Sequence, residues 1–196
     1  MDKREQILAA AIKRFSHFGI KKTTMAEIGE DVGLSKANLY YYFSDKAVLV
    51  ASIIDFLFDE SDRLFKERCA VGTSTLDKLK LFVRLRYEMY GRYQMLVVSL
   101  TEYHGLQAID GTIFEQIVAR EAGLIARVLD EGIACGELVT FDTQETSELY
   151  VAGQYGISMF HKARCARPFM DEAIMENISR KQELLAERIV NGILRK

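Results

Sequence analysis

The residues from Lys36 to Tyr42 combine the side chains that proteins use to contact DNA. The segment reads KANLYYY, so a lysine, an asparagine and three adjacent tyrosines lie close together. Lysine and asparagine form hydrogen bonds with base edges in the major groove, and hydroxyl groups reach phosphate oxygens. In a helix, Leu39 and Phe43 would face inward, four residues apart, and leave the polar residues outside. The spacing therefore predicts a short helix that reads DNA.

Turn and capping signals place this segment in a helix-turn-helix. Thr24 and Glu27 form a Thr-x-x-Glu capping box, which predicts the start of a preceding helix that carries Ile28. Gly33 ends that helix, because glycine adopts a positive φ without steric cost. Ser35 can cap the following helix. An ordinary amphipathic hairpin is the alternative, but so short a helix cannot bury three tyrosines.

We expect DNA contacts from the residues on and beside these two helices. Lys36 and Asn38 are assigned to base edges, with Tyr41 sharing that role. The phosphate contacts are assigned to Thr24, Tyr40, Tyr42 and Lys46. Lys46 stands in the first turn of the next helix, where its charge opposes the helix dipole. The complete predicted interface is Thr24, Ser35, Lys36, Ala37, Asn38, Tyr40, Tyr41, Tyr42 and Lys46. Lys21 and Lys22 are further candidates for phosphate contacts. Lys3 and Arg4 could also contact phosphate, or they could simply keep the chain terminus solvated; the sequence favours neither.

This pattern resembles the helix-turn-helix of the tetracycline-repressor (TetR) family of bacterial transcription regulators. The likeness covers about the first fifty residues and is specific in order and spacing. The matching positions are Ile7, Ala11, Phe15, Phe18-Gly19, Thr23-Thr24, Ile28, Val32-Gly33-Leu34-Ser35, Leu39-Tyr40-Tyr41-Tyr42-Phe43, Lys46 and Leu49. Gly29 and Val32 depart from it, since the family usually has alanine there. Beyond residue 50, the likeness is only in length and helical character.

The resemblance implies an all-α protein with two domains. Residues 1–46 would form a three-helix, helix-turn-helix DNA-binding domain. Residues 47–196 would form a larger helical domain for effector binding and dimerisation. In this family, the last two helices make a four-helix bundle across a two-fold axis. A homodimer of this kind matches a palindromic double-stranded DNA operator, with reading helices about 34–36 Å apart.

Composition and charge agree with this expectation. The 196 residues carry a net charge of −2, and residues 1–46 hold eight Lys or Arg against six Asp or Glu. A mildly basic head on an acidic body is compatible with DNA binding, which depends on the local field. The odd number of cysteines, without a CxxC motif, suits reduced thiols. No signal peptide is evident and the apolar runs are too short for a bilayer, so we expect a cytoplasmic protein with no membrane association.

Apolar periodicity predicts long helices throughout the chain. A helix over 3–18 precedes the helix-turn-helix, and another runs from the first turn after it to about Arg68. A loop follows at 69–75. Further helices are expected over 76–98, 112–131, 143–165 and, starting at Pro168, about 169–194, with a broken or short helix at 101–111. The helix over 143–165 carries apolar or small residues almost all round, which predicts that it is buried.

A ligand pocket is predicted in the body from its aromatic stripes. Arg86 lies inside an apolar stripe and could meet an acidic group on a ligand; alternatively it lies along the surface with its head in water or paired with a glutamate. Mixed aromatic and methionine surfaces line ligand cavities, although they also form ordinary cores. The predicted pocket residues are Arg86, Met89, Tyr90, Tyr93, Tyr103, Phe114, Tyr150, Gln154 and His161.

Catalytic and metal-binding signatures are weak. The sequence has no Gly-rich phosphate loop, GxSxG or HExxH, and His161 and Cys165 lack a third ligand nearby, so we expect no cofactor and no metal. Cys69 is a candidate for oxidation. The leading hypothesis is a DNA-binding repressor released by a small-molecule effector. An effector-independent DNA-binding protein controlled by a partner protein is the second, and a small helical enzyme using Tyr or His is the third.

Overall fold

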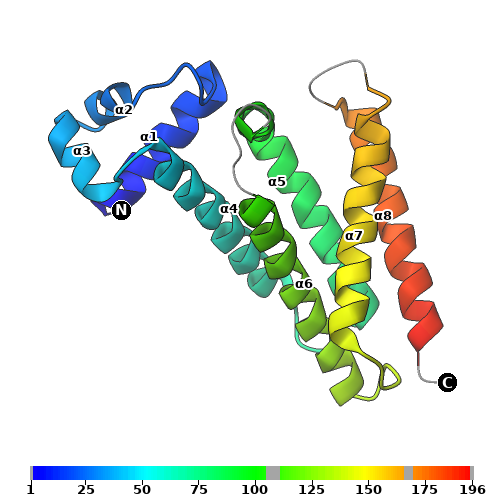
Figure 1. The fold of residues 1–196 in the computed structure, drawn as a ribbon. Helices are drawn as coiled ribbons and strands as arrows, with labels where there is room; N and C mark the ends of the chain where they lie inside the picture. The colour runs from blue at the N-terminus through cyan, green and yellow to red at the C-terminus, as the bar shows by residue number, and fades with distance from the viewer. Residues whose placement is uncertain (1, 105–110, 166–169, 195–196) are drawn as a thin grey trace. The chain divides into compact units, whose positions relative to one another are not determined.

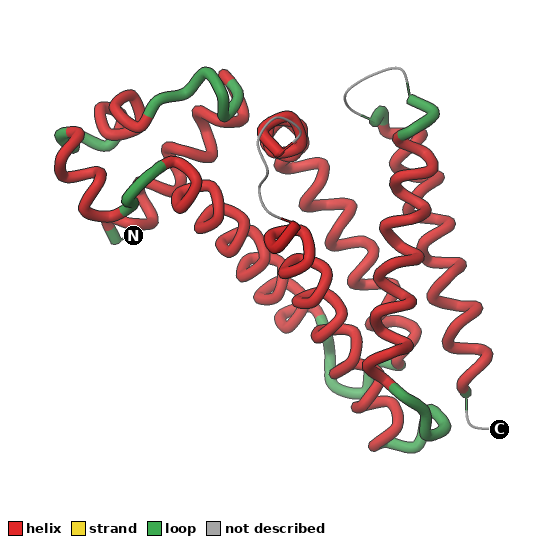
Figure 2. The backbone as a smooth tube through the Cα atoms, viewed as in Figure 1, coloured by secondary structure: helices red, strands yellow, loops and turns green. Residues whose placement is uncertain are grey.

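The structure is a computed structural model that describes residues 2–104, 111–165 and 170–194; the side chains of 101–104 and 111–114 lie outside the described part. Within these ranges the chain is all-α, as predicted, with helices joined by loops (Figures 1 and 2). The helices are α1 (Lys3–Phe18), α2 (Met25–Asp31), α3 (Lys36–Tyr42), α4 (Lys46–Arg68), α5 (Thr75–His104), α6 (Gly111–Ala134), α7 (Thr143–Lys162) and α8 (Glu172–Ile193).

The chain divides into two compact units. The N-terminal unit consists of Met1–Arg63 and Met89–Ile109, and the C-terminal unit consists of Leu64–Glu88 and Asp110–Lys196. Helices α4 and α5 therefore each contribute residues to both units. The division into functional domains at residue 46 stays a prediction, because compactness alone does not say which residues bind DNA or effector.

Helix α1 forms the support of the N-terminal unit. Asp2 accepts a hydrogen bond from the Glu5 backbone N–H, and Glu5 accepts one from the Asp2 backbone N–H, so a reciprocal capping box starts the helix. Ile7 and Phe15 lie on its fully buried face. Gly19 ends the helix with a φ of 81°, a conformation that glycine adopts readily.

The second half of α5 completes the N-terminal unit. Ser99 Oγ donates a hydrogen bond of 3.0 Å to the carbonyl oxygen of Phe15, at the last turn of α1. The predicted end of this helix at 98 is wrong, since α5 continues to His104, and its irregularity lies at Tyr93, with φ −116° and ψ 22°. The Tyr93 hydroxyl donates to Glu60 at 2.8 Å, and Arg92 pairs with the same carboxylate. Such contacts between separate helices are invisible to periodicity.

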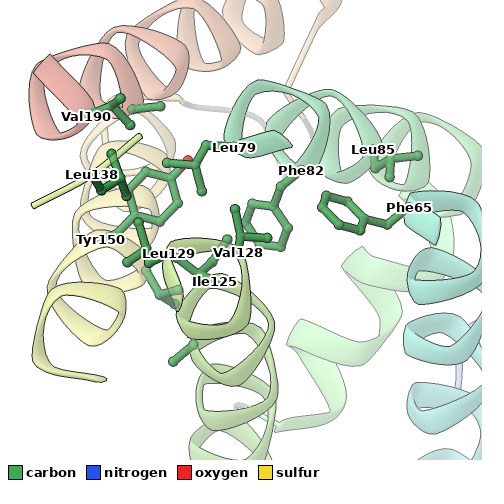
Figure 3. Close-up of a cluster of buried hydrophobic side chains, with 13 residues drawn as sticks. Phe65, Leu79, Phe82, Leu85, Ile125, Val128, Leu129, Leu138, Tyr150 and Val190 are labelled. Carbon is green, nitrogen blue, oxygen red and sulfur yellow. The ribbon is translucent and has the colours of Figure 1, made fainter. Parts of the chain in front are cut away.

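The core of the C-terminal unit is built from α5, α6, α7 and α8, with Phe65 from the end of α4. Figure 3 shows aromatic and aliphatic side chains from these helices, including Phe82, Ile125, Tyr150 and Val190, gathered in one buried cluster. Thr75, at the start of α5, donates through its backbone N–H and its hydroxyl to Glu137. This contact fastens the start of α5 to the segment that follows α6.

The last two helices start at acidic caps. Asp142 accepts from the Glu145 N–H at 2.9 Å, and Asp171 accepts from the Ile174 N–H at 3.0 Å. The last helix therefore begins at Glu172, later than predicted from Pro168, which itself lies outside the described residues. Within this single chain α7 is not buried all round, because one face bears the exposed Phe160.

None of the described helices combines the length and apolar character that crossing a membrane requires. The described residues contain no cluster of three or more His, Cys, Asp or Glu side chains that could hold a metal ion.

Candidate nucleic-acid interface

Helices α2 and α3 begin at the predicted caps. Thr24 Oγ1 accepts a hydrogen bond from the Glu27 N–H at 3.3 Å, and the Glu27 carboxylate accepts from the Thr24 N–H at 2.7 Å. The hydroxyl of Thr24 also donates to Glu27 at 2.8 Å, and these bonds lower the pKa of Glu27. Ser35 Oγ accepts from the Asn38 N–H at 3.2 Å. At the start of each helix, the capping side chain thus accepts a hydrogen bond from a backbone N–H that has no partner within the helix.

The turn between the two helices depends on two glycines. Gly33 has a φ of 68°, and its N–H donates to the carbonyl of Glu30. Gly29 lies against the turn: its carbonyl accepts from the Leu34 N–H at 2.8 Å, and a Cβ at this position would lie 3.0 Å from the Leu34 carbonyl oxygen. The absence of a side chain at Gly29 therefore permits the close approach of α2 to the turn.

Helix α3 buries one face and exposes the other. Leu39 and Phe43 are fully buried, whereas Tyr41 is 86% exposed and Tyr40 is 39% exposed. Tyr42 is half-buried, and its ring lies edge-on to that of Tyr41 with centroids 5.4 Å apart. The exposed residues of the segment also include Ser35, Lys36, Ala37 and Asn38. A solvent-facing row of amine, amide and phenol groups results.

Arg14 ties α1 to α2. Its guanidinium donates to both carboxylate oxygens of Asp31, one bond measuring 2.9 Å, and lies 3.6 Å from Glu27. The guanidinium holds the pKa of Asp31 below its usual value, and the carboxylate raises the pKa of Arg14. A two-pronged pair of this geometry fixes the orientation of α2 on its support.

Lys46 binds backbone carbonyls in the free chain. Its ammonium donates to the carbonyl oxygens of Ile20 at 2.9 Å and Thr23 at 3.1 Å, which explains a cation in the first turn of α4. Burial lowers the pKa of Lys46. The lysine therefore holds the segment that leads into α2, and its predicted contact with phosphate stays a prediction.

The basic residues near the chain start also have partners. Lys3 donates to the carbonyl of Val32 at 2.9 Å, at the end of α2. Arg4 donates to Ser52 at 3.1 Å and lies over the ring of Phe43 at 4.7 Å. Both contacts hold the helix-turn-helix in place. Lys21 and Lys22 are exposed.

The residues predicted to line a pocket do not belong to one unit. Met89, Tyr90 and Tyr93 belong to the N-terminal unit. Those of the C-terminal unit are Arg86, Tyr150, Gln154 and His161. The side chains of Tyr103 and Phe114 lie outside the described residues. His161 is half-buried, and its Nε2 lies 3.0 Å from the ammonium of Lys181, which contributes to lowering the pKa of His161 after the larger effect of desolvation.

Two residues beside Arg86 in the C-terminal unit were not predicted from the sequence. Glu121 lies 3.6 Å from Arg86, and Tyr155 carries its ring 4.6 Å from the same guanidinium. A signal for Glu121 existed, because it falls in the apolar stripe of α6, four residues before Ile125. Two opposite charges, each inside an apolar stripe of a different helix, are typical of a buried pair.

The capped helices, the glycine turn and the exposed face of α3 define a helix-turn-helix protein. A family model described as bacterial regulatory proteins, tetR family, matches residues 7–53. Residues 7–53 therefore match the helix-turn-helix part of this family.

Two similar proteins agree with this assignment. The chain is 32% identical over 87 residues to a probable HTH-type transcriptional regulator, ArpR, of Pseudomonas putida, a match covering 44% of this chain and 40% of the relative. It is 34% identical over 94 residues to the HTH-type transcriptional regulator RutR of Escherichia coli K12, covering 46% and 42%. These matches span only about two fifths of the curated relatives.

Solved structures extend the likeness along the whole chain. A transcriptional regulator from Cytophaga hutchinsonii superposes with a TM-score of 0.77 at 29% identity, covering 97% of this chain and 98% of the other. A protein described as a TetR-family regulator from Rhodococcus superposes with a TM-score of 0.70 at 19% identity, covering 95% and 98%. The second likeness concerns the fold alone.

Proposed function

We propose that this protein is a transcriptional repressor that binds a palindromic operator as a homodimer and is released by a small-molecule effector. The observation that carries the proposal is α3, which presents a row of exposed amine, amide and phenol groups on two fully buried anchors, Leu39 and Phe43. A helix of this kind suits a major groove. The family consists of regulatory proteins rather than enzymes. Such a regulator would act in the cytoplasm, where the bacterial chromosome lies.

In this proposal the residues of α3 divide between bases and phosphates. Lys36, Asn38 and Tyr41 contact base edges, since they are exposed on the outer face. Tyr40 and Tyr42 contact phosphates, together with the N-terminus of α2 at Thr24. Phosphate contacts set register and affinity, and base contacts set sequence preference.

The outer face of α7 supports the homodimer. Leu149, Ala152, Gly156 and Phe160 follow one another at spacings of three and four residues, and all are exposed. Leu149 is 66% and Phe160 58% exposed, which is unusual for side chains of this size. The same stripe on a second copy would cover them across a two-fold axis.

Electrophoretic mobility of the DNA that flanks the protein's own gene tests DNA binding. We expect specific retardation that survives competition by unrelated DNA and weakens steeply as salt rises. The variant Tyr41→Ala keeps both anchors of α3 and should lose most of this specificity. Absence of specific retardation at low salt would refute the proposal.

Sedimentation tests the dimer. Phe160→Glu places a charge in the proposed interface and should convert the dimer to a monomer. Val71→Glu is a matched control, because Val71 is also an exposed apolar residue but lies in the loop before α5. A wild-type protein that sediments as a monomer at micromolar concentration would contradict the homodimer.

Release by an effector requires that the effector bind the two states of the dimer with different affinities. A metabolite library screened by thermal shift finds ligands of the folded protein. A hit that also reverses the retardation of operator DNA supports the effector part of the proposal. Retardation that no hit reverses would favour control by a partner protein.

A further inference from the structure

A charged pair lies between two helices of the C-terminal unit. Arg86 of α5 and Glu121 of α6 approach to 3.6 Å between Nε and Oε1. This distance exceeds the usual 2.7–3.2 Å of an N–H···O hydrogen bond, so the contact is an ion pair without a hydrogen bond. The guanidinium lies over the rings of Tyr155 and Phe82, at 4.6 and 5.6 Å.

Four buried side-chain atoms of the C-terminal unit lack hydrogen-bond partners among the described residues. They are Arg86 Nη1, Glu121 Oε2, Tyr150 OH and Gln154 Oε1. Tyr150 and Gln154 are completely buried, and Glu121 is 7% exposed. Native proteins pair the large majority of buried side-chain polar atoms with protein or water, because an unpaired one is costly. Several of them in one unit therefore indicate a site for a polar ligand.

Tyr150 belongs to the same electrostatic environment as the charged pair. Burial raises the pKa of the Tyr150 hydroxyl, and the charges of Arg86 and Glu121 also act on it. Gln154 follows one turn later on α7, where its side-chain amide donates to the carbonyl of Gln182 at 3.3 Å. That bond fixes the amide orientation and leaves the Gln154 oxygen as an acceptor.

The charge balance of the cluster selects the ligand. Glu121 already neutralises Arg86, so an anionic ligand would face the carboxylate and a cationic ligand the guanidinium. An uncharged group that accepts from Arg86 and donates to Glu121 meets neither repulsion. An amide or lactam has both functions on adjacent atoms, and the rings of Phe82 and Tyr155 suit an apolar or aromatic body.

We propose that Arg86, Glu121 and Tyr150 bind an uncharged ligand through an amide-like group that both accepts and donates hydrogen bonds. This inference rests on the proposed function, in which the ligand is the effector. Of the two alternatives that the sequence left open for Arg86, it sets aside the acidic ligand, because the carboxylate partner of Arg86 is part of the protein.

Three molecules of nearly the same shape test the proposal. Benzamide is uncharged and has an acceptor and a donor, benzoate is an anion, and benzamidine is a cation. So small a ligand binds weakly, with a Kd on the order of 1 mM. We expect isothermal titration of the full chain to show saturable, one-site binding of benzamide at least about tenfold tighter than of either ion. Tighter binding of benzoate, or no binding of benzamide, would overturn the proposal.

Conservative variants connect binding to the named atoms. Tyr150→Phe removes one oxygen without changing shape, and should weaken benzamide binding about 3- to 10-fold, the effect of one hydrogen bond. Because the hydroxyl has no partner among the described residues, the melting temperature without ligand should not fall. Tyr87→Phe, at a half-buried position of the same unit, is the control variant and should change neither quantity. Equal affinities of wild type and Tyr150→Phe would contradict the role of Tyr150.

Failure of this inference is distinguishable from failure of the proposed function. Operator retardation without benzamide binding would remove the ligand class and leave the regulator. Benzamide binding that depends on Tyr150, without operator retardation, would keep the site and remove the regulator.

Discussion

Helix α3 and the Arg86–Glu121 pair place polar groups in opposite environments. On α3, Lys36, Asn38 and Tyr41 face solvent, and their positions are fixed by the buried Leu39. In the C-terminal unit the charges are inside, and their own pairing leaves polar atoms unmatched among the described residues. Exposed polar groups cost little to hold ready for a partner, whereas buried ones are costly without one. The exposed groups of α3 suit a large, charged partner. The buried groups of the C-terminal unit suit a small ligand that makes the missing hydrogen bonds.

The strongest way to sharpen this comparison is to change the anchor and the exposed side chain of α3 separately. Leu39→Ala should lower the free energy of unfolding by about 2–5 kcal/mol, because it leaves a cavity under the helix. Tyr41→Ala should change it by less than about 0.5 kcal/mol, because the side chain is mostly in water. Urea denaturation measures both. Comparable losses in the two variants would break the division of α3 into an anchoring face and a reading face.

The second prediction concerns the exposed amide. Asn38→Ala should weaken specific operator binding by about 1–3 kcal/mol, the range for one good base contact. Binding to unrelated DNA should stay nearly constant, because phosphate contacts remain. Titrations with operator and scrambled DNA separate the two quantities. An unchanged operator preference would refute the assignment of Asn38 to a base.

The third prediction asks which role Lys46 has. Lys46→Met keeps the aliphatic stem but removes the bonds to the carbonyls of Ile20 and Thr23, and should lower the free energy of unfolding by about 1–2 kcal/mol. If the ammonium also contacts phosphate on DNA, the salt dependence of binding falls by about one counterion. Stability and salt slope, measured on the same variant, decide between the roles. A variant as stable as wild type would contradict the carbonyl anchor.

The smallest expected effect is a pH dependence from Glu121. Burial raises the pKa of Glu121 above its ordinary value of 4.5, so the folded chain keeps this proton at a pH where the unfolded chain has released it. Its contribution to stability is therefore present below pH 4.5 and is lost as pH rises through the folded-state pKa. Unfolding curves of wild type and Glu121→Gln from pH 4 to 8 give the difference. Parallel pH profiles would show that Glu121 has an ordinary pKa.

Sequence reasoning succeeded where structure is decided locally. The caps at Thr24 and Ser35, the positive φ at Gly33, and the burial of Leu39 and Phe43 all follow from residues within four positions of one another. Each depends on backbone geometry or helical spacing, which a single sequence displays.

Contacts between residues on different helices could not be predicted from the sequence. The pairing of Glu121 with Arg86 was missed because the two residues stand on different helices. The hydrogen bond from Tyr93 to Glu60 was missed because the two residues are far apart in sequence. The alternative in which Arg86 pairs with a glutamate is the one that the structure shows. Which DNA and pocket residues act in binding stays a prediction, since neither partner is encoded in the spacing of this chain.

The close approach of α2 to the Leu34 carbonyl at Gly29 has a consequence for sequence variation. A methyl group there already meets a backbone oxygen at 3.0 Å, and a larger substituent has no room unless the turn shifts. In a saturation library selected for folding alone, this codon should converge on the two smallest residues, while the codon for Tyr41 drifts freely. Natural variants would then carry few different amino acids at position 29 for a steric reason, independent of any operator.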